Sequence, residues 1–314
     1  MIPALVLTAG LGTRLRPLSL VRAKAAVPVA GQPLVTRILR QLRAAGVTDA
    51  VLNLHHLPHT LTRLVGDGSD LDIRVRYSWE VPLLGSAGGP RQALSLLGAP
   101  TFLIVNGDTL TDVDIGALVA AHRRSGALVT MAVVPNAEPQ KYGGVVVDMD
   151  GTVTGFAKRG SSQAAYHFVG LQVAEAAAFA SVDAGSSCES VAAVYPSLIG
   201  NQPGSVRGHV CAAEFCDIGT PNDYLRTSLL LMRREGGVWP QGARTRVDVT
   251  ARVEASILWD DVEVGAGSML RGCIVADGAR VPDGTSWAGV TLRQAAGELA
   301  PGERRIGELA VASL

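Results

Sequence analysis

Two glycines and three basic residues near the start of the chain have the types and spacing of an anion-binding loop. The strand-like segment 2–8 leads into the sequence GLGTRLRP at positions 10–17, and Lys24 follows. Glycine lets the backbone turn sharply and come close to an anion, so that successive N–H groups can point toward it. Arg14, Arg16 and Lys24 add cations, which stabilise a transferring phosphoryl group as its charge redistributes. The pattern predicts phosphate chemistry at this loop.

Two common phosphate-binding loops do not fit these residues. A dinucleotide-binding fingerprint needs a third glycine where Leu15 stands, and an acidic residue at the end of the second strand, where this chain has His55 and His56. A Walker A loop needs Gly-Lys-Ser or Gly-Lys-Thr, which the sequence lacks. The loop therefore belongs to another class of phosphate-binding site.

Composition and charge limit the class of protein. The 314 residues carry 28 basic and 28 acidic side chains, so no net charge favours nucleic acid or an anionic membrane surface. No apolar run approaches the roughly 18 residues of a membrane span, and the first residues lack a basic leader. The four cysteines show no C-x-x-C spacing and do not indicate a disulfide framework. We expect a cytoplasmic enzyme that binds neither nucleic acid nor membrane.

Strand and helix patterns alternate to about residue 232 and predict an α/β fold. Strands are expected at 2–8, 50–54, 72–78, 101–105, 127–134 and within 142–175, and helices near 34–46, 88–97 and 112–125. The segment 144–151 ends in Asp-Gly, which predicts a hairpin. A closing helix is expected from Pro221 to Arg234.

The last part of the chain has a different pattern. Between positions 247 and 292, aliphatic or small residues recur about every six positions, at Val247, Val253, Leu258, Val264, Leu270 and Ala276. The spacing shifts once, at 255–257. A six-residue period resembles the hexapeptide repeat of a left-handed parallel β-helix. We expect a short β-helix that serves packing or homo-oligomerisation, with an irregular β tail as the alternative. The predicted division is 1–235, 244–292 and a tail at 293–314.

Four segments resemble the sugar-1-phosphate nucleotidylyltransferases, also called NDP-sugar pyrophosphorylases. The loop at 10–17 with Lys24 matches the family pattern G-x-G-T-R-x-x-P followed by a lysine. Residues 80–89 (EVPLLGSAGG) are similar to its E-x-P-L-G-T-A-G, 106–108 to its N-G-D, and 215–224 (FCDIGTPNDY) to its W-x-D-I-G-T-P-x-D-Y. In motif style the chain is nearest to mannose-1-phosphate guanylyltransferase-like members with a hexapeptide tail.

The resemblance implies a Rossmann-like nucleotidyltransferase domain that joins a nucleoside triphosphate to a sugar 1-phosphate, giving NDP-sugar and pyrophosphate. It assigns stabilisation of the developing charge to Arg14 and Lys24, and Mg²⁺ binding to Asp108 and Asp217. Nucleotide binding is implied for Ala9, Gly10, Gly12, Thr13, Glu80, Gly85, Ala87 and Gly88. Sugar-phosphate binding is implied for Tyr142, Gly143, Lys158 and Gly170.

Several alternatives stay open. Glu80 favours GTP, because guanine presents two adjacent donors to one carboxylate, but a UTP- or dTTP-dependent enzyme is the alternative. Asp108 and Asp217 could instead be helix caps. A further group of arginines is expected to line solvated faces: Arg22, Arg37, Arg40 and Arg43.

Departures from the family pattern concentrate on the sugar side. Ala157-Lys158-Arg159 stands where the family has E-K-P, and Phe168-Val169-Gly170 stands where it has N-A-G. With Ala157 and the ring of Phe168 at these positions, we expect a preference for sugars with fewer hydroxyls or a bulkier apolar edge. The same departures suit an alternative of another class, a non-catalytic homologue that binds NDP-sugar and regulates a partner.

Overall fold

The computed structural model describes residues 2–236 and 241–314, which form two compact units. One unit comprises Met1–Gly10 and Val35–Cys216, and the other comprises Leu11–Leu34 and Asp217–Leu314. This differs from the expected division along the chain. The glycine-basic loop and the closing helix belong to the same unit as the C-terminal repeats, because side chains of all three pack together, as described below.

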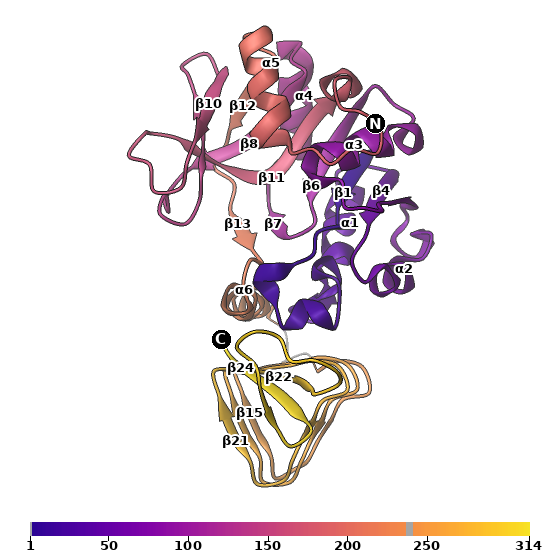
Figure 1. Ribbon diagram of the computed structural model, residues 1–314, viewed down its shortest axis with the longest axis vertical. Helices are drawn as coiled ribbons and strands as arrows, with labels where there is room; N and C mark the ends of the chain where they lie inside the picture. The colour runs from indigo at the N-terminus through magenta and orange to yellow at the C-terminus, as the bar shows by residue number, and fades with distance from the viewer. Residues whose placement is uncertain (1, 237–240) are drawn as a thin grey trace. The chain divides into compact units, whose positions relative to one another are not determined.

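A nine-stranded sheet forms the centre of the first unit (Figure 1), in the order β10-β9-β11-β6-β1-β4-β5, with β8 paired to β11 and β12. Its strands are β1 Ala4–Leu7, β4 Asp49–Leu54, β5 Arg74–Trp79, β6 Thr101–Asn106, β8 Val129–Pro135, β9 Gly144–Val147, β10 Val153–Ala157, β11 Tyr166–Glu175 and β12 Val206–Val210. The central strand β1 pairs in parallel with β4 and β6. The carboxyl ends of these parallel strands therefore lie at one edge, where ligands bind in open α/β sheets.

The helices of this unit confirm most of the expected pattern. They are α1 Leu34–Ala44, α2 Pro58–Val65, α3 Gly85–Leu97, α4 Ile115–Ser125 and α5 Tyr195–Asn201. The expected helix at 112–125 starts three residues late because Asp114 is its N-cap, with Oδ1 2.9 Å from the amide of Ala117. Helices α2 and α5 and strand β12 were not expected. The predicted Asp-Gly hairpin is confirmed, since β9 and β10 are antiparallel and Gly151 has φ of 89°.

The main buried cluster joins the sheet to the helices on its face. It includes Leu5 of β1, Phe102 and Ile104 of β6, Met131 of β8 and Tyr195 of α5. These side chains are almost completely removed from water. Burial of this kind is the main driving force for folding and holds the strand ends in place.

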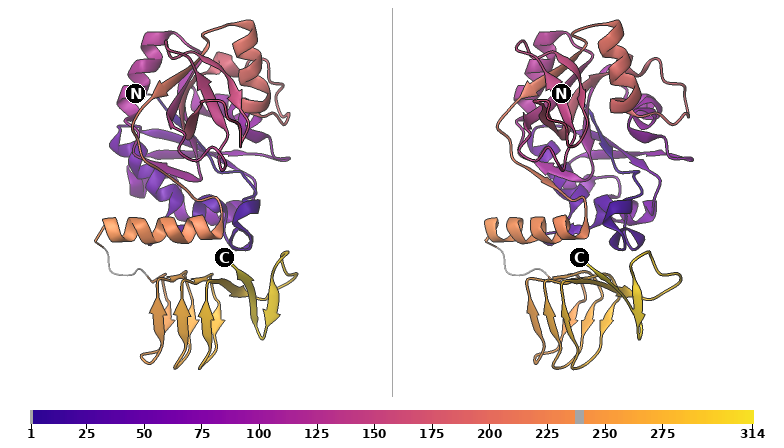
Figure 2. Two further views of the ribbon diagram at one scale, coloured as in Figure 1. Left: turned by 90° about the vertical axis from the view of Figure 1, so that its left-hand side faces the viewer. Right: turned by 60° about the vertical axis from the view of Figure 1, so that its left-hand side comes forward.

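The second unit starts with the loop 11–34, which contains three short 3₁₀ turns and a small hairpin. Its elements are η1 Thr13–Leu15, η2 Leu18–Leu20, η3 Lys24–Ala26, β2 Pro28–Val29, β3 Gln32–Pro33 and, later in the chain, α6 Pro221–Arg234. The remaining strands form a short left-handed parallel β-helix, whose stacked coils are visible in Figure 2. They are β14 Arg246–Val247, β15 Arg252–Glu254, β16 Ile257–Leu258, β17 Glu263–Val264, β18 Met269–Arg271, β19 Ile274–Val275, β20 Arg280–Val281, β21 Ser286–Ala288 and β22 Val290–Gln294.

The β-helix repeats every 17 residues, as shown by the strand register that pairs Arg246 with Glu263 and Glu263 with Arg280. Three stacks of inward side chains follow from the strand register: Val247, Val264 and Val281; Val253, Leu270 and Trp287; Leu258, Val275 and Leu292. One side of each coil is therefore one residue shorter than a hexapeptide. The shift seen at 255–257 recurs in each coil, so the expected repeat position at Ala276 is wrong and Val275 occupies it.

The C-terminal segment 293–314, expected as a tail, forms a hairpin that extends the β-helix. Strands β23 (Arg304–Ile306) and β24 (Leu309–Ser313) are antiparallel, and β24 pairs with β22. A buried ion pair joins Arg293 of β22 to Glu303 at the start of this hairpin, with 2.5 Å between Nη2 and Oε2. Among the described residues, no helix has the length and apolar character needed to cross a membrane.

Candidate active site

The first strand delivers the start of the glycine-basic loop to a buried asparagine. Oδ1 of Asn53, near the end of β4, accepts hydrogen bonds from the amides of Thr8 (2.6 Å) and Ala9 (3.2 Å). The amide of Ala9, expected to bind nucleotide, is thus occupied by Asn53. Gly10 is exposed, and a Cβ built on it would meet nothing within 4 Å. The open part of the loop therefore begins at Gly10.

Glu80 is part of the same buried network. Its side chain is fully buried, Oε1 accepts from Nδ2 of Asn53 (2.7 Å), and Oε2 accepts from the amide of Leu84 (2.9 Å). A carboxylate enclosed in this way cannot meet a base without a rearrangement. The expectation that Glu80 selects guanine by direct contact therefore has no geometric support, and Glu80 instead holds Asn53 and the loop after it.

We expect Glu80→Ala to lower the free energy of unfolding by about 1–3 kcal/mol, because the Asn53 amide and the Leu84 N–H would lose their buried acceptor. Urea unfolding measures this change. Glu138→Ala is the matched control, since Glu138 is an exposed glutamate of the same unit. Equal stability of the two variants would contradict the supporting role.

The loop at 80–89, expected to recognise the base, is contacted by a segment about 100 residues later in the chain. The carbonyl of Cys188 accepts from the amides of Ala87 (2.9 Å) and Gly88 (3.2 Å), and Oε2 of Glu189 accepts from Oγ of Ser86 at 2.5 Å. Two of the expected nucleotide-binding residues, Ala87 and Gly88, therefore use their amides within the fold. Glu189 is the exposed carboxylate of this loop, and nothing in its local sequence distinguished it.

Asp108 follows β6 in a turn that is fixed by the neighbouring strand. The amide of Gly107 donates to the carbonyl of Leu7 at 3.0 Å, and a Cβ on Gly107 would lie 2.5 Å from that oxygen. Only glycine allows this approach, so the Asn-Gly-Asp sequence places a half-buried Asp108 beside the end of β1. The alternative of a helix cap does not hold, because Asp114 caps the next helix.

The sugar-side residues are arranged differently from the expectation. Phe168 is half-buried and packs against the main core. The neighbouring His167 instead contacts Tyr142 and Phe215, with ring centroids 4.3 Å and 4.4 Å away. Gly170 lies in β11 where the pairing with β8 shifts register. We call Tyr142, His167 and Phe215 the aromatic group.

Two other expected sugar-phosphate residues lie next to this group. Lys158 follows β10 and is exposed, and Gly143 is exposed beside Tyr142. A Cβ on Gly143 would lie 3.1 Å from the carbonyl oxygen of Ala157. The backbone next to Tyr142 therefore lies close to the backbone next to Lys158. Nζ of Lys141 lies 5.1 Å from the Tyr142 ring centroid, which adds a cation next to the aromatic group.

Burial lowers the pKa of His167 from 6.5 to about 4. The unfolded chain therefore binds more protons than the folded protein between these pH values, and stability is lost as pH falls from about 6.5 to about 4. We expect His167→Gln to lose less stability than the wild type between pH 7 and pH 5 in thermal melts. His59→Gln, at an exposed position, is the control. Parallel pH profiles for wild type and His167→Gln would contradict the prediction.

In the second unit, the glycine turn and the lysine that follows it are packed together. Gly12 has φ of 61°, and a Cβ on it would lie 3.0 Å from Cβ of Ser19 and 3.3 Å from Cβ of Lys24. Oγ of Ser19 donates to the carbonyl of Gly12 at 2.8 Å. The loop thus folds back so that half-buried Lys24 lies against the turn.

Arg14 and Asp217 meet around Gly219. A Cβ on Gly219 would lie 2.7 Å from Oδ2 of Asp217, 3.2 Å from Nη1 of Arg14 and 3.2 Å from Oδ2 of Asp223. Asp217 is not the cap of α6, because Thr220 accepts from the amide of Asp223 at 3.1 Å. A guanidinium and a carboxylate thus lie close together at the start of α6, beside exposed Thr13.

The residues present can hold a divalent cation only with help from a substrate. Within residues 2–236 and 241–314, no group of three or more His, Cys, Asp or Glu side chains is arranged to hold a metal. Mg²⁺ needs no such cage, since one or two carboxylates together with phosphate oxygens and water suffice. Asp108 in the first unit and Asp217 in the second each offer carboxylate oxygens of the type that this chemistry uses.

Comparison with known proteins agrees with these features. The family described as "Nucleotidyl transferase" matches residues 3–233, and the one described as "GlmU-like, C-terminal hexapeptide" matches residues 242–296. A mannose-1-phosphate guanylyltransferase from Mycobacterium tuberculosis is 30% identical over 297 residues, which cover 90% of this chain and 82% of that protein. A UTP–glucose-1-phosphate uridylyltransferase from Synechocystis is 26% identical, over 88% of this chain and 76% of that protein.

A solved structure shares the fold. HddC from Yersinia pseudotuberculosis, complexed with GMP-PN, has a TM-score of 0.65 at 22% sequence identity, over 74% of this chain and 100% of HddC. With the match over residues 3–233, these findings show that the chain belongs to the nucleotidyl transferase family and has a hexapeptide-type β-helix at its C-terminal end.

Proposed function

We propose that the chain transfers a nucleoside monophosphate, GMP in preference to others, from the triphosphate to a sugar 1-phosphate, releasing pyrophosphate. The observation that supports this most is the meeting of Arg14 and Asp217 around Gly219, close to the glycine-basic loop. A cation and a metal-type carboxylate in one place suit phosphoryl transfer, where positioning and charge stabilisation do nearly all of the catalysis.

Each residue has a defined task in this proposal. The sugar phosphate oxygen attacks the α-phosphorus in line, while the amides from Gly10 to Thr13 hold the outer phosphates. Arg14 and Lys24 stabilise the charge that develops on the leaving pyrophosphate. Lys158 holds the attacking phosphate. Mg²⁺, bound through Asp108 and Asp217, would neutralise phosphate charge. No covalent intermediate is required.

The base preference is supported by relatives rather than by Glu80. Chains named as mannose-1-phosphate guanylyltransferases are similar to this one over most of its length, and the uridylyltransferase relative is the basis for UTP as the alternative. The test measures kcat/KM for GTP, UTP, dTTP, CTP and ATP. Mg²⁺ is present, and pyrophosphate release is the assay. We expect the highest value for GTP. A higher value for UTP or dTTP would refute the base assignment while leaving the reaction class in place.

The sugar preference is proposed to depend on the aromatic group and on Ala157. Ala157 cannot accept a hydroxyl hydrogen bond, and an unpaired buried hydroxyl costs about 1–3 kcal/mol, or roughly tenfold or more in specificity. We therefore expect deoxy or apolar-edged sugar 1-phosphates to exceed glucose and mannose 1-phosphates in kcat/KM. An optimum on glucose or mannose would show that His167, Tyr142 or Gln172 has restored the usual hydroxyl contacts.

Two further expectations stay predictions. The cytoplasmic location and a homo-oligomer formed through the β-helix follow from the sequence alone. Sedimentation of the full chain measures whether it forms a homo-oligomer.

A further inference from the structure

Arg22 of the glycine-basic loop is held by two carboxylates of the β-helix. Its Nε and Nη2 donate to the two oxygens of Asp277, both at 2.7 Å, and Nη2 also donates to Oδ2 of Asp260 at 2.6 Å. Only 11% of the Arg22 side chain is exposed. This contradicts the expectation of a solvated Arg22, since a planar guanidinium with two such partners is bound at a fixed angle.

An aromatic pair continues this contact. Cζ of Arg22 lies 5.3 Å from the ring centroid of Trp259, which is fully buried. Nε1 of Trp259 donates to the hydroxyl of Tyr224 in α6 at 2.9 Å, and that hydroxyl donates to the carbonyl of Pro28 at 2.5 Å. The loop is therefore fixed to the β-helix at Arg22 and, through Tyr224, at Pro28.

These two fixed points enclose the part of the loop that carries Lys24. The amide of Arg22 donates to the carbonyl of Leu18. Leu18, which precedes Arg22 in the sequence, and Ala23, which follows it, are both fully buried. Lys24 follows directly and lies against Gly12. A displacement of the backbone at Arg22 would therefore be passed to Lys24 and, through it, to the glycine turn.

We propose that Arg22 is a positioning residue, through which Asp260 and Asp277 of the β-helix set the conformation of the phosphate loop and hence the placement of Lys24. The β-helix then contributes to the reaction of the first part of the chain, besides any role in assembly. The catalytic consequence rests on the proposed function, whereas the conformational one does not.

Two changes at the contact test the proposal. Arg22→Met removes the guanidinium and keeps an unbranched apolar stem. Asp260→Asn with Asp277→Asn keeps the guanidinium and removes its charged partners. Arg22→Lys keeps the charge but cannot reach both carboxylates with a fork, so it should restore activity only in part.

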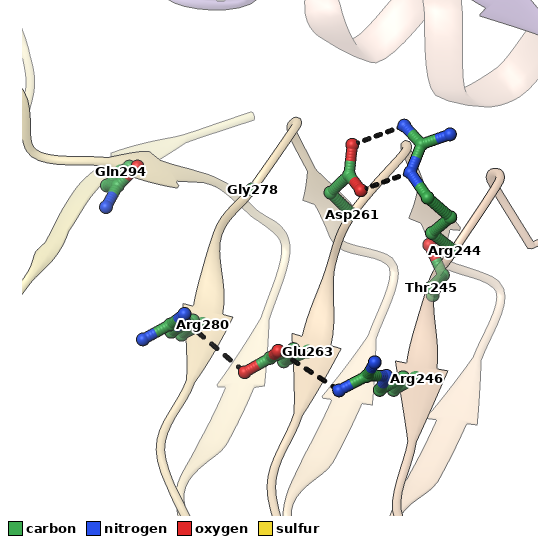
Figure 3. Close-up of a pocket in the computed structure, with 8 residues that line it drawn as sticks. All are labelled: Arg244, Thr245, Arg246, Asp261, Glu263, Gly278, Arg280 and Gln294. Carbon is green, nitrogen blue, oxygen red and sulfur yellow. Dashed lines mark hydrogen bonds and ion pairs between the residues drawn. The ribbon is translucent and has the colours of Figure 1, made fainter.

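The matched control is another bidentate arginine of the same β-helix. Arg244 donates through Nε and Nη2 to the two oxygens of Asp261, both at 2.6 Å, and Figure 3 shows this pair between neighbouring coils. It touches neither the loop nor α6 in the contacts described. Arg244→Met therefore removes a bidentate ion pair of the β-helix, here an exposed one, without altering the support of Lys24.

Two measurements are made at a temperature where thermal melts show all variants folded. The first is amide hydrogen exchange over residues 11–26 of the unliganded chain. We expect faster exchange in Arg22→Met and in the double Asp variant than in Arg244→Met. The second is steady-state kinetics, where we expect kcat to fall about tenfold or more with a smaller rise in the KM for nucleotide, because misplacing a charge-stabilising group affects mainly the transition state.

The outcomes separate the two claims. Unchanged exchange in Arg22→Met would show that Arg22 does not set the loop, and the proposal would be wrong. Faster exchange with kcat within about twofold of wild type would also overturn it, since the loop would then be fixed for stability alone. If the wild type itself shows no turnover, the proposed function fails, and the exchange experiment still decides whether the β-helix sets the loop.

Discussion

Asp108→Ala is expected to lower kcat about a thousandfold or more while the fold persists. Removing a carboxylate that binds the metal takes away charge stabilisation worth several kcal/mol of the barrier. The fold should persist because Asp108 is half-buried and the backbone of its turn is held by the amide of Gly107, which donates to the carbonyl of Leu7. Pyrophosphate release at saturating Mg²⁺ measures the change, and circular dichroism checks the fold.

A surface aspartate provides the comparison. Asp70, in an exposed 3₁₀ turn of the same unit, is replaced by alanine in parallel. Asp108→Asn keeps the size of the side chain and removes its negative charge. We expect it to be almost as inactive as Asp108→Ala. Turnover near the wild-type rate in folded, Mg²⁺-saturated Asp108→Ala would show that this carboxylate does not bind the metal.

Arg14→Ala is expected to lower kcat by about a hundredfold to a thousandfold, the range seen when one preorganised donor is removed from a site of developing charge. Arg14 is exposed, and its Nη1 lies near Gly219 beside Asp217, so its loss leaves the packing of the loop in place. The KM for nucleotide should rise less than kcat falls, because the interaction is strongest in the transition state.

The arginine series separates charge from shape. Arg14→Lys should recover part of the rate, since the cation remains but the planar fork is lost. Arg252→Ala, at an exposed position of β15, controls for the loss of a positive charge elsewhere in the same unit. If Arg14→Ala and Arg252→Ala had the same kcat, the catalytic assignment of Arg14 would be withdrawn.

Features that depend on neighbouring residues were predictable from the sequence. The strands and the turn at Gly107 follow from short apolar runs and from residue types that act over a few positions. The return of Lys24 to Gly12 likewise involves only a short stretch of chain. The β-helix was predictable because its repeat is periodic, although one short side in each coil moved the expected position from Ala276 to Val275.

Features that depend on distant partners were not predictable. The partners of Arg22 lie 238 and 255 positions away, so nothing local distinguished it from solvated arginines. Glu80 was assigned to the base by its motif, but its burial depends on Asn53, which lies 27 positions earlier. Whether Phe168 or its neighbour His167 joins the aromatic group depends on which face of β11 is covered. Successive side chains of a strand point to opposite faces, so a shift of one residue exchanges the two.

The most direct test of the account identifies the product from a mixture of substrates. The chain is incubated with Mg²⁺, all five nucleoside triphosphates and a panel of hexose, deoxyhexose, amino-sugar and heptose 1-phosphates, and mass spectrometry detects NDP-sugars while pyrophosphate is assayed. We predict one dominant GDP-sugar, formed in a one-to-one ratio with pyrophosphate and absent from Asp108→Ala. No NDP-sugar from any pair, in a folded wild-type preparation, would contradict nucleotidyl transfer to a sugar 1-phosphate.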